Sequence, residues 1–253
     1  MSQLRGASSV VSTVVSADSA LWTASWMPRE SVDTASWLLR ADRGVTNRAN
    51  SAVPRGPAGT AIRELEAIYG ERSLPAIAQI PTHARFSELD GELAVRGYTL
   101  HTPTLVQLLR LRPEHAGVGG AAVTDKPSAA WTARYLATDG RGDERADAVQ
   151  LEIVTRTPAR YLMSADSDVA VARLSVHGDI AALSCMSVAG THRGLGHGGM
   201  LLRAAVGEAA TLGCRHVALQ VAADNAPALR LYRAAGFATV DRYHYRVEPA
   251  TGE

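Results

Sequence analysis

Glycines, an arginine and a tyrosine late in the chain are the residues whose types and spacing could do chemistry. Residues 193–199 read R-G-L-G-H-G-G, between a strand-like run, Ile180–Val188, and a helix-like run, 200–212. Glycines let backbone N–H groups approach a phosphate closely, and the start of a helix adds a partial positive charge. We therefore expect this turn to bind a phosphorylated ligand, with Arg193 framing the phosphates.

Two other phosphate-binding loops do not fit these residues. A P-loop needs a lysine followed by serine or threonine after its last glycine, whereas Met200 follows Gly199 here. A dinucleotide fingerprint places its glycines after a first strand, with an acidic residue about 20 residues further on. Here the loop lies late in the chain, and Asp224 comes only after the next expected strand.

A second motif follows the loop at a short distance. Residues 225–232 read N-A-P-A-L-R-L-Y, and Gly236 and Phe237 come next. Tyr232 carries a phenol with a reference pKa of about 10, which makes it a neutral proton donor at pH 7 and a candidate general acid. The alternative is an ordinary core aromatic.

Together the two motifs resemble the GNAT superfamily of acyl-CoA N-acyltransferases. Arg193, Gly196 and Gly198 match its pyrophosphate signature, and the second motif is matched by Asn225, Ala228, Leu231, Tyr232, Gly236 and Phe237. The resemblance implies that Tyr232 protonates the departing thiolate and that a backbone N–H near Val188 polarises the thioester carbonyl. It implies acetyl-CoA as co-substrate, no metal, and these cofactor-binding residues: Met186, Ser187, Val188, Arg193, Gly194, Leu195, Gly196, His197, Gly198 and Asn225.

The general base is not evident from the residues. Some relatives carry a glutamate on the strand before the loop, but residues 181–184 read A-A-L-S. His177, Asp179, His216 and His244 are candidates, and each also suits a turn or a strand end. A chain of waters, or an amine that arrives already neutral, is equally compatible with the sequence.

The two halves of the chain are similar, which predicts a tandem arrangement. Residues 55–61 align with 193–199 at an offset of 138 (193 − 55), and residues 93–98 align with 232–237 at an offset of 139 (236 − 97). In the first half Ala58 and Thr60 replace both signature glycines. We therefore expect that this half has the plan of the fold without the cofactor site.

The expected fold is α/β, with two tandem GNAT-like units whose mixed, mainly antiparallel sheets are flanked by helices. The first unit covers residues 1–112, the second residues 121–253, and residues 113–120 form a linker. Expected strands cover 36–39, 45–53, 77–80, 159–163, 169–176, 180–188, 216–221, 237–240 and 243–247, with an extended segment from Tyr98 onward. Expected helices cover 60–69, 86–95, 200–212 and 226–235.

Composition narrows the choice of partners and compartment. The net charge of +1 favours neither nucleic acid nor an anionic membrane as partner, and no apolar run is long enough to span a bilayer. Cys185 and Cys214 form no disulfide framework and are expected as reduced thiols. A cytoplasmic protein is expected, and its four tryptophans are expected to serve core or inter-domain packing, not an aromatic acceptor cage.

The acceptor is predicted only broadly, as a small-molecule primary amine. The polar stretch 46–51, T-N-R-A-N-S, either lines a cleft where Arg48 binds an acidic acceptor or forms a polar edge with turn residues. This stretch, with Y-H-Y-R at 243–246, resembles two-unit bacterial GNAT proteins, some of them assigned as N-acetylglutamate synthases. Glutamate is therefore a candidate acceptor. A non-catalytic acetyl-CoA-binding sensor or interaction module is the alternative function.

Overall fold

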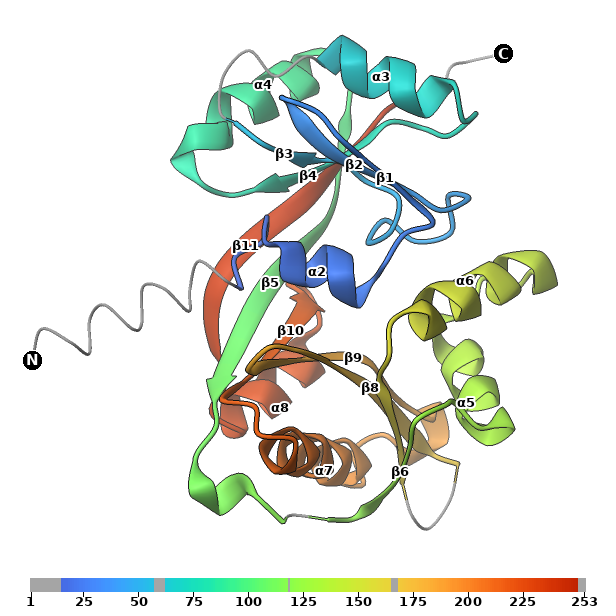
Figure 1. Cartoon of the computed structure of the whole chain (residues 1–253), viewed down its shortest axis with the longest axis vertical. Helices are drawn as coiled ribbons and strands as arrows, with labels where there is room; N and C mark the ends of the chain where they lie inside the picture. Colours follow the sequence, from blue (N-terminus) through green and yellow to red (C-terminus); the bar gives the residue numbers. More distant parts are fainter. Residues whose placement is uncertain (1–14, 57–61, 118, 165–167, 250–253) are drawn as a thin grey trace, which may run out of the picture. The chain divides into compact units, whose positions relative to one another are not determined.

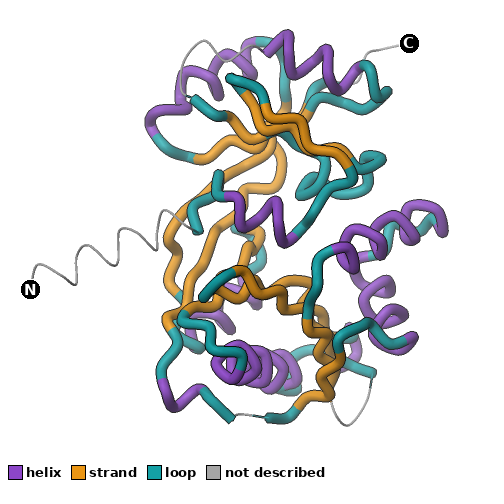
Figure 2. Tube along the Cα trace, in the orientation of Figure 1, coloured by secondary structure: helices purple, strands orange, loops and turns teal. Residues whose placement is uncertain are grey.

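The computed structural model describes residues 15–56, 62–117, 119–164 and 168–249 (Figures 1 and 2). The chain divides into two compact units. Unit 1 comprises residues 1–106, 222–224 and 240–253, and unit 2 comprises residues 107–221 and 225–239. Strands β5 and β11 contribute residues to both units. The assignment of segments 1–112 and 121–253 as two GNAT-like domains stays a prediction.

Unit 1 begins with a short helix and small strands and ends with the last strand of the chain. Its elements are α2 (Ala20–Ser25), β1 (Glu30–Asp33), β2 (Trp37–Ala41), β3 (Val53–Pro54), α3 (Ile62–Gly70), β4 (Ile77–Pro81), the 3₁₀ turn η1 (Ala84–Phe86), α4 (Ser87–Val95) and most of β5 (Thr99–Arg110) and β11 (Ala238–Val247). Strands β1, β2 and β3 form an antiparallel sheet, and β4 pairs antiparallel with β11.

Unit 2 holds the longer strands and the longest helix. Its elements are η2 (Pro113–His115), β6 (Ala121–Thr124), α5 (Ala129–Asp139), α6 (Glu144–Arg156), β7 (Arg160–Ser164), β8 (Ala170–His177), β9 (Ile180–Val188), η3 (Gly190–His192), α7 (His197–Thr211), β10 (His216–Ala222) and α8 (Ala226–Ala234). Its strands follow the order β5-β10-β9-β8-β7-β6. Strands β9 and β10 run parallel, whereas β6–β7, β7–β8 and β8–β9 are antiparallel. The predicted α/β class with mixed, mainly antiparallel sheets is confirmed.

One predicted strand is wrong. Residues 45–51 form turns, and β3 is limited to Val53–Pro54. The cause is the side chain of Asn50, whose Oδ1 accepts hydrogen bonds from the backbone N–H groups of Asp42 (2.6 Å) and Gly44 (2.8 Å). Its Nδ2 donates to the carbonyl of Thr46 at 2.9 Å. An amide committed to three backbone groups holds a turn, so the turn interpretation of this polar stretch is the correct one.

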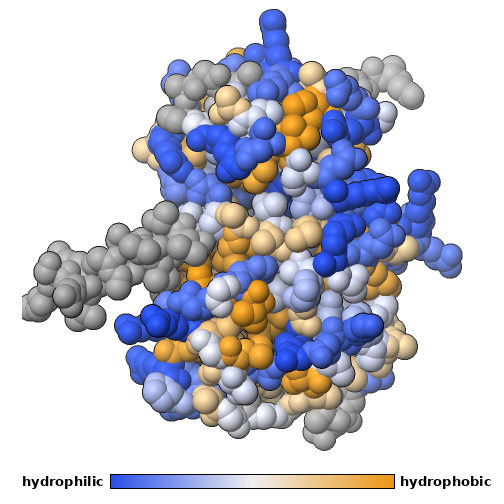
Figure 3. All heavy atoms as spheres, viewed as in Figure 1, coloured by the Kyte–Doolittle hydropathy of each residue, from blue (hydrophilic) through white to orange (hydrophobic). Residues whose placement is uncertain are grey.

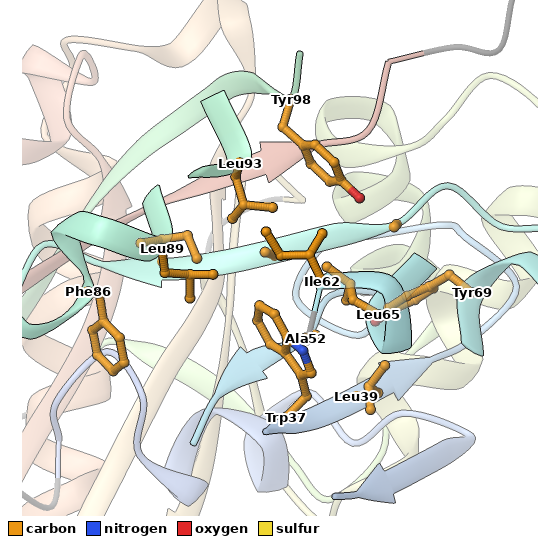
Figure 4. Close-up of a cluster of buried hydrophobic side chains, with 13 residues drawn as sticks. Trp37, Leu39, Ala52, Ile62, Leu65, Tyr69, Phe86, Leu89, Leu93 and Tyr98 are labelled. Atoms are coloured by element: carbon orange, nitrogen blue, oxygen red, sulfur yellow. The ribbon is translucent and has the colours of Figure 1, made fainter. Parts of the chain in front are cut away.

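The core of unit 1 gathers around Trp37, which is fully buried (Figure 4). Apolar side chains from one face of α3 and one face of α4 meet those of β2 and β4. Ile62, Leu65 and Tyr69 recur at helical spacing, which explains why this segment forms a helix once it packs on the sheet. The repeat anchor at residues 55–61 cannot be compared, because residues 57–61 lie outside the described residues.

The core of unit 2 is organised by an aromatic group on α5 and β7. The indole of Trp131 donates to the carbonyl of Ala172 on β8 at 3.0 Å, and its ring lies 5.1 Å from Tyr161 and 5.2 Å from Tyr135, measured between ring centroids. Trp22, Trp26 and Trp37 are also buried, so the prediction that the four tryptophans serve packing is confirmed.

The second repeat anchor has the same local geometry in both halves. After α4, Gly97 has φ +86° and the N–H of Tyr98 donates to the carbonyl of Leu93 at 3.0 Å. After α8, Gly236 has φ +89° and the N–H of Phe237 donates to the carbonyl of Tyr232 at 3.0 Å. A glycine is needed at each place because other residues rarely adopt this left-handed conformation.

Hydrophobic residues on the face drawn in Figure 3 lie in small areas among hydrophilic ones. Among the described residues, no helix has the length and apolar character needed to cross a bilayer.

Candidate active site

The glycine loop leads directly into the first turn of α7. Gly194 and Gly196 adopt φ +80° and +90°, and a Cβ built on either glycine would meet no atom within 4 Å. Gly196 caps α7, so the N–H groups of His197, Gly198 and Gly199 precede the first intrahelical bond, from Met200 to Gly196 at 3.1 Å. The turn therefore combines open space with N–H donors at the positive end of a 15-residue helix.

Gly198 has a different role, which is close packing. A Cβ at this position would lie 3.5 Å from Leu231 Cδ2 and 3.7 Å from Val188 Cγ2, and 3.9 Å from the terminal methyl of Met186. The start of α7 thus rests on the end of β9 and on α8. The absence of a side chain lets the loop, the strand and the second motif come together.

Strand β9 carries a β-bulge just before the loop. Val171 of β8 pairs with Ser187 of β9, and Arg173 pairs with Ser184, so the same stretch spans two residues of β8 and three of β9. Within that stretch Cys185 adopts φ +53°, a left-handed conformation uncommon for residues other than glycine.

The bulge coincides with the point where β9 leaves β10. Their parallel register runs from Ile180–His216 to Leu183–Leu219, and β9 continues to Val188. Within the described residues, 184–188 therefore have no register partner on β10. On the edge of β9 that faces β10, the backbone of this segment can therefore pair with a ligand. The sequence alone does not show this separation of the two strands.

Tyr232 lies on the α8 side of the bulged strand. Its hydroxyl is 3.6 Å from Met186 Sδ, and its ring centroid is 5.7 Å from that of Phe237. Burial raises the pKa of Tyr232 to about 12, so the phenol keeps its proton across the ordinary pH range. The helix that carries it starts at Asn225, whose Oδ1 accepts from the N–H of Ala228 at 3.2 Å.

The other predicted binding residues surround the same place. Arg193 is exposed, and its Nε donates to the carbonyl of Val188 at 3.4 Å, so its guanidinium folds back toward the end of β9. Leu195 is 66% exposed, an apolar side chain at the tip of the loop. Asn225 acts as the helix cap predicted from its position. The cofactor-binding role of these residues stays a prediction.

The predicted candidates for the general base do not meet at this place. His177, Asp179 and His216 lie at the Ile180 end of β9, where His177 contacts Ser175 Oγ at 3.0 Å. Six residues of strand, about 20 Å, separate that end from Met186. His244 belongs to unit 1, where it contacts Asp90 at 2.8 Å.

A buried arginine at the bulge was not predicted. Arg173 is fully buried, and its Nη1 donates to Ser184 Oγ at 3.3 Å while its Nη2 donates to the carbonyl of Thr157 at 3.4 Å. Its Nε has no hydrogen-bond partner among the described residues. The signal in the sequence is one charged residue inside the apolar strand A-V-A-R-L-S-V.

The neighbouring thiol is held by three side chains. Tyr135 of α5 and Ser184 both hydrogen-bond to Cys185, and Arg173 acts on it electrostatically. Burial outweighs these effects and raises the pKa of the Cys185 thiol above its usual range. Cys185 and Cys214 are both free cysteines, as predicted.

Three features define the class of protein. They are strand β9, which separates from β10 after Leu183, the glycine loop before α7, and the tyrosine on α8. They are the parts of an N-acetyltransferase of the GCN5-related (GNAT) type. Among the described residues, no group of three or more His, Cys, Asp or Glu side chains is arranged to hold a metal ion.

Comparison with known proteins shows the family. The family model described as "Probable histone acetyltransferase Rv0428c C-terminal" matches residues 18–246, and the chain belongs to this family of acetyltransferases. The uncharacterized N-acetyltransferase YobR of Bacillus subtilis (strain 168) is 28% identical over 238 residues, which cover 90% of this chain and 96% of YobR.

Solved structures agree on the fold. A GCN5-related N-acetyltransferase from Kribbella flavida superposes with a TM-score of 0.66 at 18% identity, covering 92% of this chain and 94% of the other. A tandem GNAT protein from the clavulanic acid biosynthesis pathway gives a TM-score of 0.59 at 15% identity, covering 92% and 87%. The protein is a GNAT-type acetyltransferase.

Proposed function

We propose that this enzyme transfers the acetyl group of acetyl-CoA directly to a primary amine, with the donor site in unit 2. The observation that carries the proposal is the meeting of three features within that unit. The glycine loop opens α7, β9 leaves β10 at the bulge, and the Tyr232 hydroxyl lies 3.6 Å from Met186.

The residues present fit acetyl-CoA as donor. The N–H groups of the first turn of α7 would hold the pyrophosphate, and Arg193 would add a positive charge beside it. On the side away from β8, where β10 has no register partner for them, the backbone groups of Met186, Ser187 and Val188 would hydrogen-bond to the amide groups of the pantetheine arm. Leu195, exposed at the tip of the loop, would cover an apolar part of the donor.

The same residues supply the chemistry. A backbone N–H near Val188 would stabilise the negative charge that develops on the carbonyl oxygen when the amine attacks. Tyr232 would give its proton to the departing sulfur as the carbon–sulfur bond breaks. Its elevated pKa suits a donor that must be protonated before each turnover.

We further propose that the first half is a GNAT-like unit without a donor site. Each half has a buried arginine that hydrogen-bonds to a serine hydroxyl: Arg40–Ser51 at 2.7 Å, and Arg173–Ser184. The two pairs are separated by the same 133 residues (173 − 40 and 184 − 51). The two halves differ in the length of the strand near this serine. Strand β3 has two residues and β9 has nine, so unit 1 lacks a segment equivalent to the one that carries the bulge.

The acceptor is a primary amine. A small molecule such as an amino acid, including glutamate, is the first candidate. A protein amine is the second, favoured by the histone acetyltransferase named in the description of the family. The test is a mass-spectrometric screen of acetylated products from amino acids, polyamines, aminoglycosides and histone-tail peptides. Binding of acetyl-CoA without any acetylated product would favour the sensor function instead.

A further inference from the structure

A charged side chain lies at the bulge of β9 without reaching solvent. Arg173 of β8 is fully buried, and so are its neighbours Ala172 and Leu174. Its guanidinium donates to two neutral groups, Ser184 Oγ at 3.3 Å and the carbonyl of Thr157 at 3.4 Å. Its Nε has no hydrogen-bond partner among the described residues. Because an arginine keeps its positive charge wherever it lies, this charge is buried with long and incomplete hydrogen bonding.

The corresponding arginine of unit 1 is hydrogen-bonded more completely. Arg40 Nε donates to the carbonyl of Ser51 at 2.9 Å, and its Nη2 donates to Ser51 Oγ at 2.7 Å and to Gln79 Oε1 at 2.9 Å. Bonds of this length stabilise a buried arginine. The bonds of Arg173 are longer and one donor is unused, so the stability of the fold does not explain why β8 carries an arginine here.

Arg173 holds the first residue of the segment that leaves β10. In the β8–β9 ladder Arg173 pairs with Ser184, whereas the β9–β10 register ends one residue earlier, at Leu183 and Leu219. Cys185, with its φ of +53°, follows Ser184 directly. The guanidinium is therefore attached to β9 at the residue where the bulge begins.

The far end of the bulge is held by a second serine. Ser187, which pairs with Val171 of β8, donates through its Oγ to Thr138 Oγ1 of α5 at 2.7 Å. The bulge is thus anchored at both ends, to β8 by one serine and to α5 by the other. A left-handed backbone at a residue other than glycine persists only where the surrounding structure fixes it, and such places cluster at active sites.

We propose that Arg173 is a positioning residue for acetyl transfer, an inference that rests on the proposed function. Through Ser184 it holds the bulge, and the bulge keeps the backbone of residues 186–188 apart from β10 and directed at acetyl-CoA. The planar guanidinium suits this task because it bonds to β9 and to the end of α6 at once, through Ser184 and Thr157. Since Arg173 has no exposed surface, it acts through Ser184 and not on a substrate.

The experiment separates the strand from the glycine loop by using two ligands. Acetyl-CoA would contact both, whereas 3′-phospho-ADP, the nucleotide half of CoA, carries the pyrophosphate without the pantetheine arm. By calorimetry, Arg173→Met should bind acetyl-CoA about 10-fold more weakly, the effect of losing one or two backbone hydrogen bonds, and 3′-phospho-ADP as the wild type does. With the best amine of the screen, kcat should fall about 10-fold or more, because the backbone donor for the carbonyl oxygen is displaced.

Thermal stability distinguishes positioning from a structural role. Methionine fills a similar volume without a charge, so Arg173→Met should melt at or above the wild-type temperature. Ser184→Ala removes only the hydroxyl and should change affinity and kcat in the same direction by a smaller factor. Arg173→Lys keeps the charge but lacks the fork that bonds to two groups, so it should recover only part of the activity.

Unit 1 offers the matched controls. Arg40→Met and Ser51→Ala remove the equivalent arginine and hydroxyl from the other half of the chain, where the hydrogen bonds are short. Arg40→Met should lower Tm, because it leaves buried acceptors without their donor. Both variants should keep the wild-type affinity for acetyl-CoA.

Wild-type affinity and kcat in Arg173→Met would overturn the inference, and so would an equal loss of affinity for both ligands. A Tm loss in Arg173→Met as large as that of Arg40→Met, with Ser184→Ala equal to wild type, would mark Arg173 as structural and would also overturn it. Wild-type protein that does not bind acetyl-CoA would instead contradict the proposed function.

Discussion

The hydroxyl of Tyr232 lies 3.6 Å from the Sδ of Met186, one residue beyond the strained backbone of Cys185. The second motif of the sequence thereby meets the bulge of β9, although 46 residues separate the two side chains along the chain. This relationship links the proposed proton donor to the strand that we propose to pair with acetyl-CoA.

Gly196→Ala should abolish acetyl-CoA binding while the protein stays folded. A Cβ at φ +90° costs about 1–2 kcal/mol and pushes the loop away from its left-handed conformation. The matched control is Gly178→Ala in the β8–β9 turn, where φ is +62° and a Cβ also meets nothing within 4 Å. Both variants should lose similar thermal stability, and only Gly196→Ala should lose affinity by calorimetry. Equal affinity in the two would argue against the phosphate role.

Cys185→Val should lower both kcat and Tm. A β-branched side chain is poorly tolerated at φ +53°, so the bulge should relax and re-aim the backbone of Met186. Cys214→Val is the control, because Cys214 is a free, buried cysteine in the same unit without positive φ. Steady-state kinetics and thermal melts check this prediction. If Cys185→Val keeps wild-type kcat, the bulge does not govern transfer.

Asp90→Asn should destabilise the protein by about 2 kcal/mol at pH 7, the usual range for hydrogen bonds to a charged group. Burial alone would raise the pKa of Asp90, but hydrogen bonds from Arg246 and His244, at 2.7 and 2.8 Å, outweigh it and lower that pKa. A lowered pKa stabilises the fold above the unfolded value of about 3.9, and this stability is lost as the pH falls through the folded value.

Urea unfolding at several pH values measures this effect. The difference between Asp90→Asn and wild type should be largest near pH 7 and should shrink below about pH 4. Glu88→Gln, an exposed carboxylate on the same helix, should show no comparable difference at any pH. A difference for Asp90→Asn that stays constant down to pH 3 would contradict the ionic role of Asp90.

Much of unit 2 could be predicted because its signals are local. The strand Ile180–Val188 has the bounds predicted from its apolar run, and α8 begins at the predicted cap Asn225. The glycine loop and Tyr232 were recognisable as candidates because the proposed chemistry requires particular residues at fixed spacing. The bulge was not, since nothing about a cysteine in an apolar strand indicates a positive φ.

Long-range contacts explain why the continuous strand β11 was not predicted from the sequence. Two separate strands were predicted at residues 237–240 and 243–247, with the polar pair Asp241 and Arg242 between them. The structure has one strand, β11, because Asp241 accepts from the N–H of Ala17 at 2.6 Å and contacts His83 at 2.9 Å. These two partners of Asp241 lie more than 150 residues away along the chain, and no local pattern encodes them.

The central claim is that unit 2 transfers acetyl from acetyl-CoA to an amine with Tyr232 as the proton donor. Tyr232→Phe keeps the ring and removes the hydroxyl, which lies 3.6 Å from Met186 Sδ. The most direct measurement is thiol release from acetyl-CoA with the best amine of the screen, for wild type and Tyr232→Phe. The account predicts a kcat lower by about 100- to 10,000-fold with unchanged acetyl-CoA affinity. A near-normal kcat in Tyr232→Phe would contradict it.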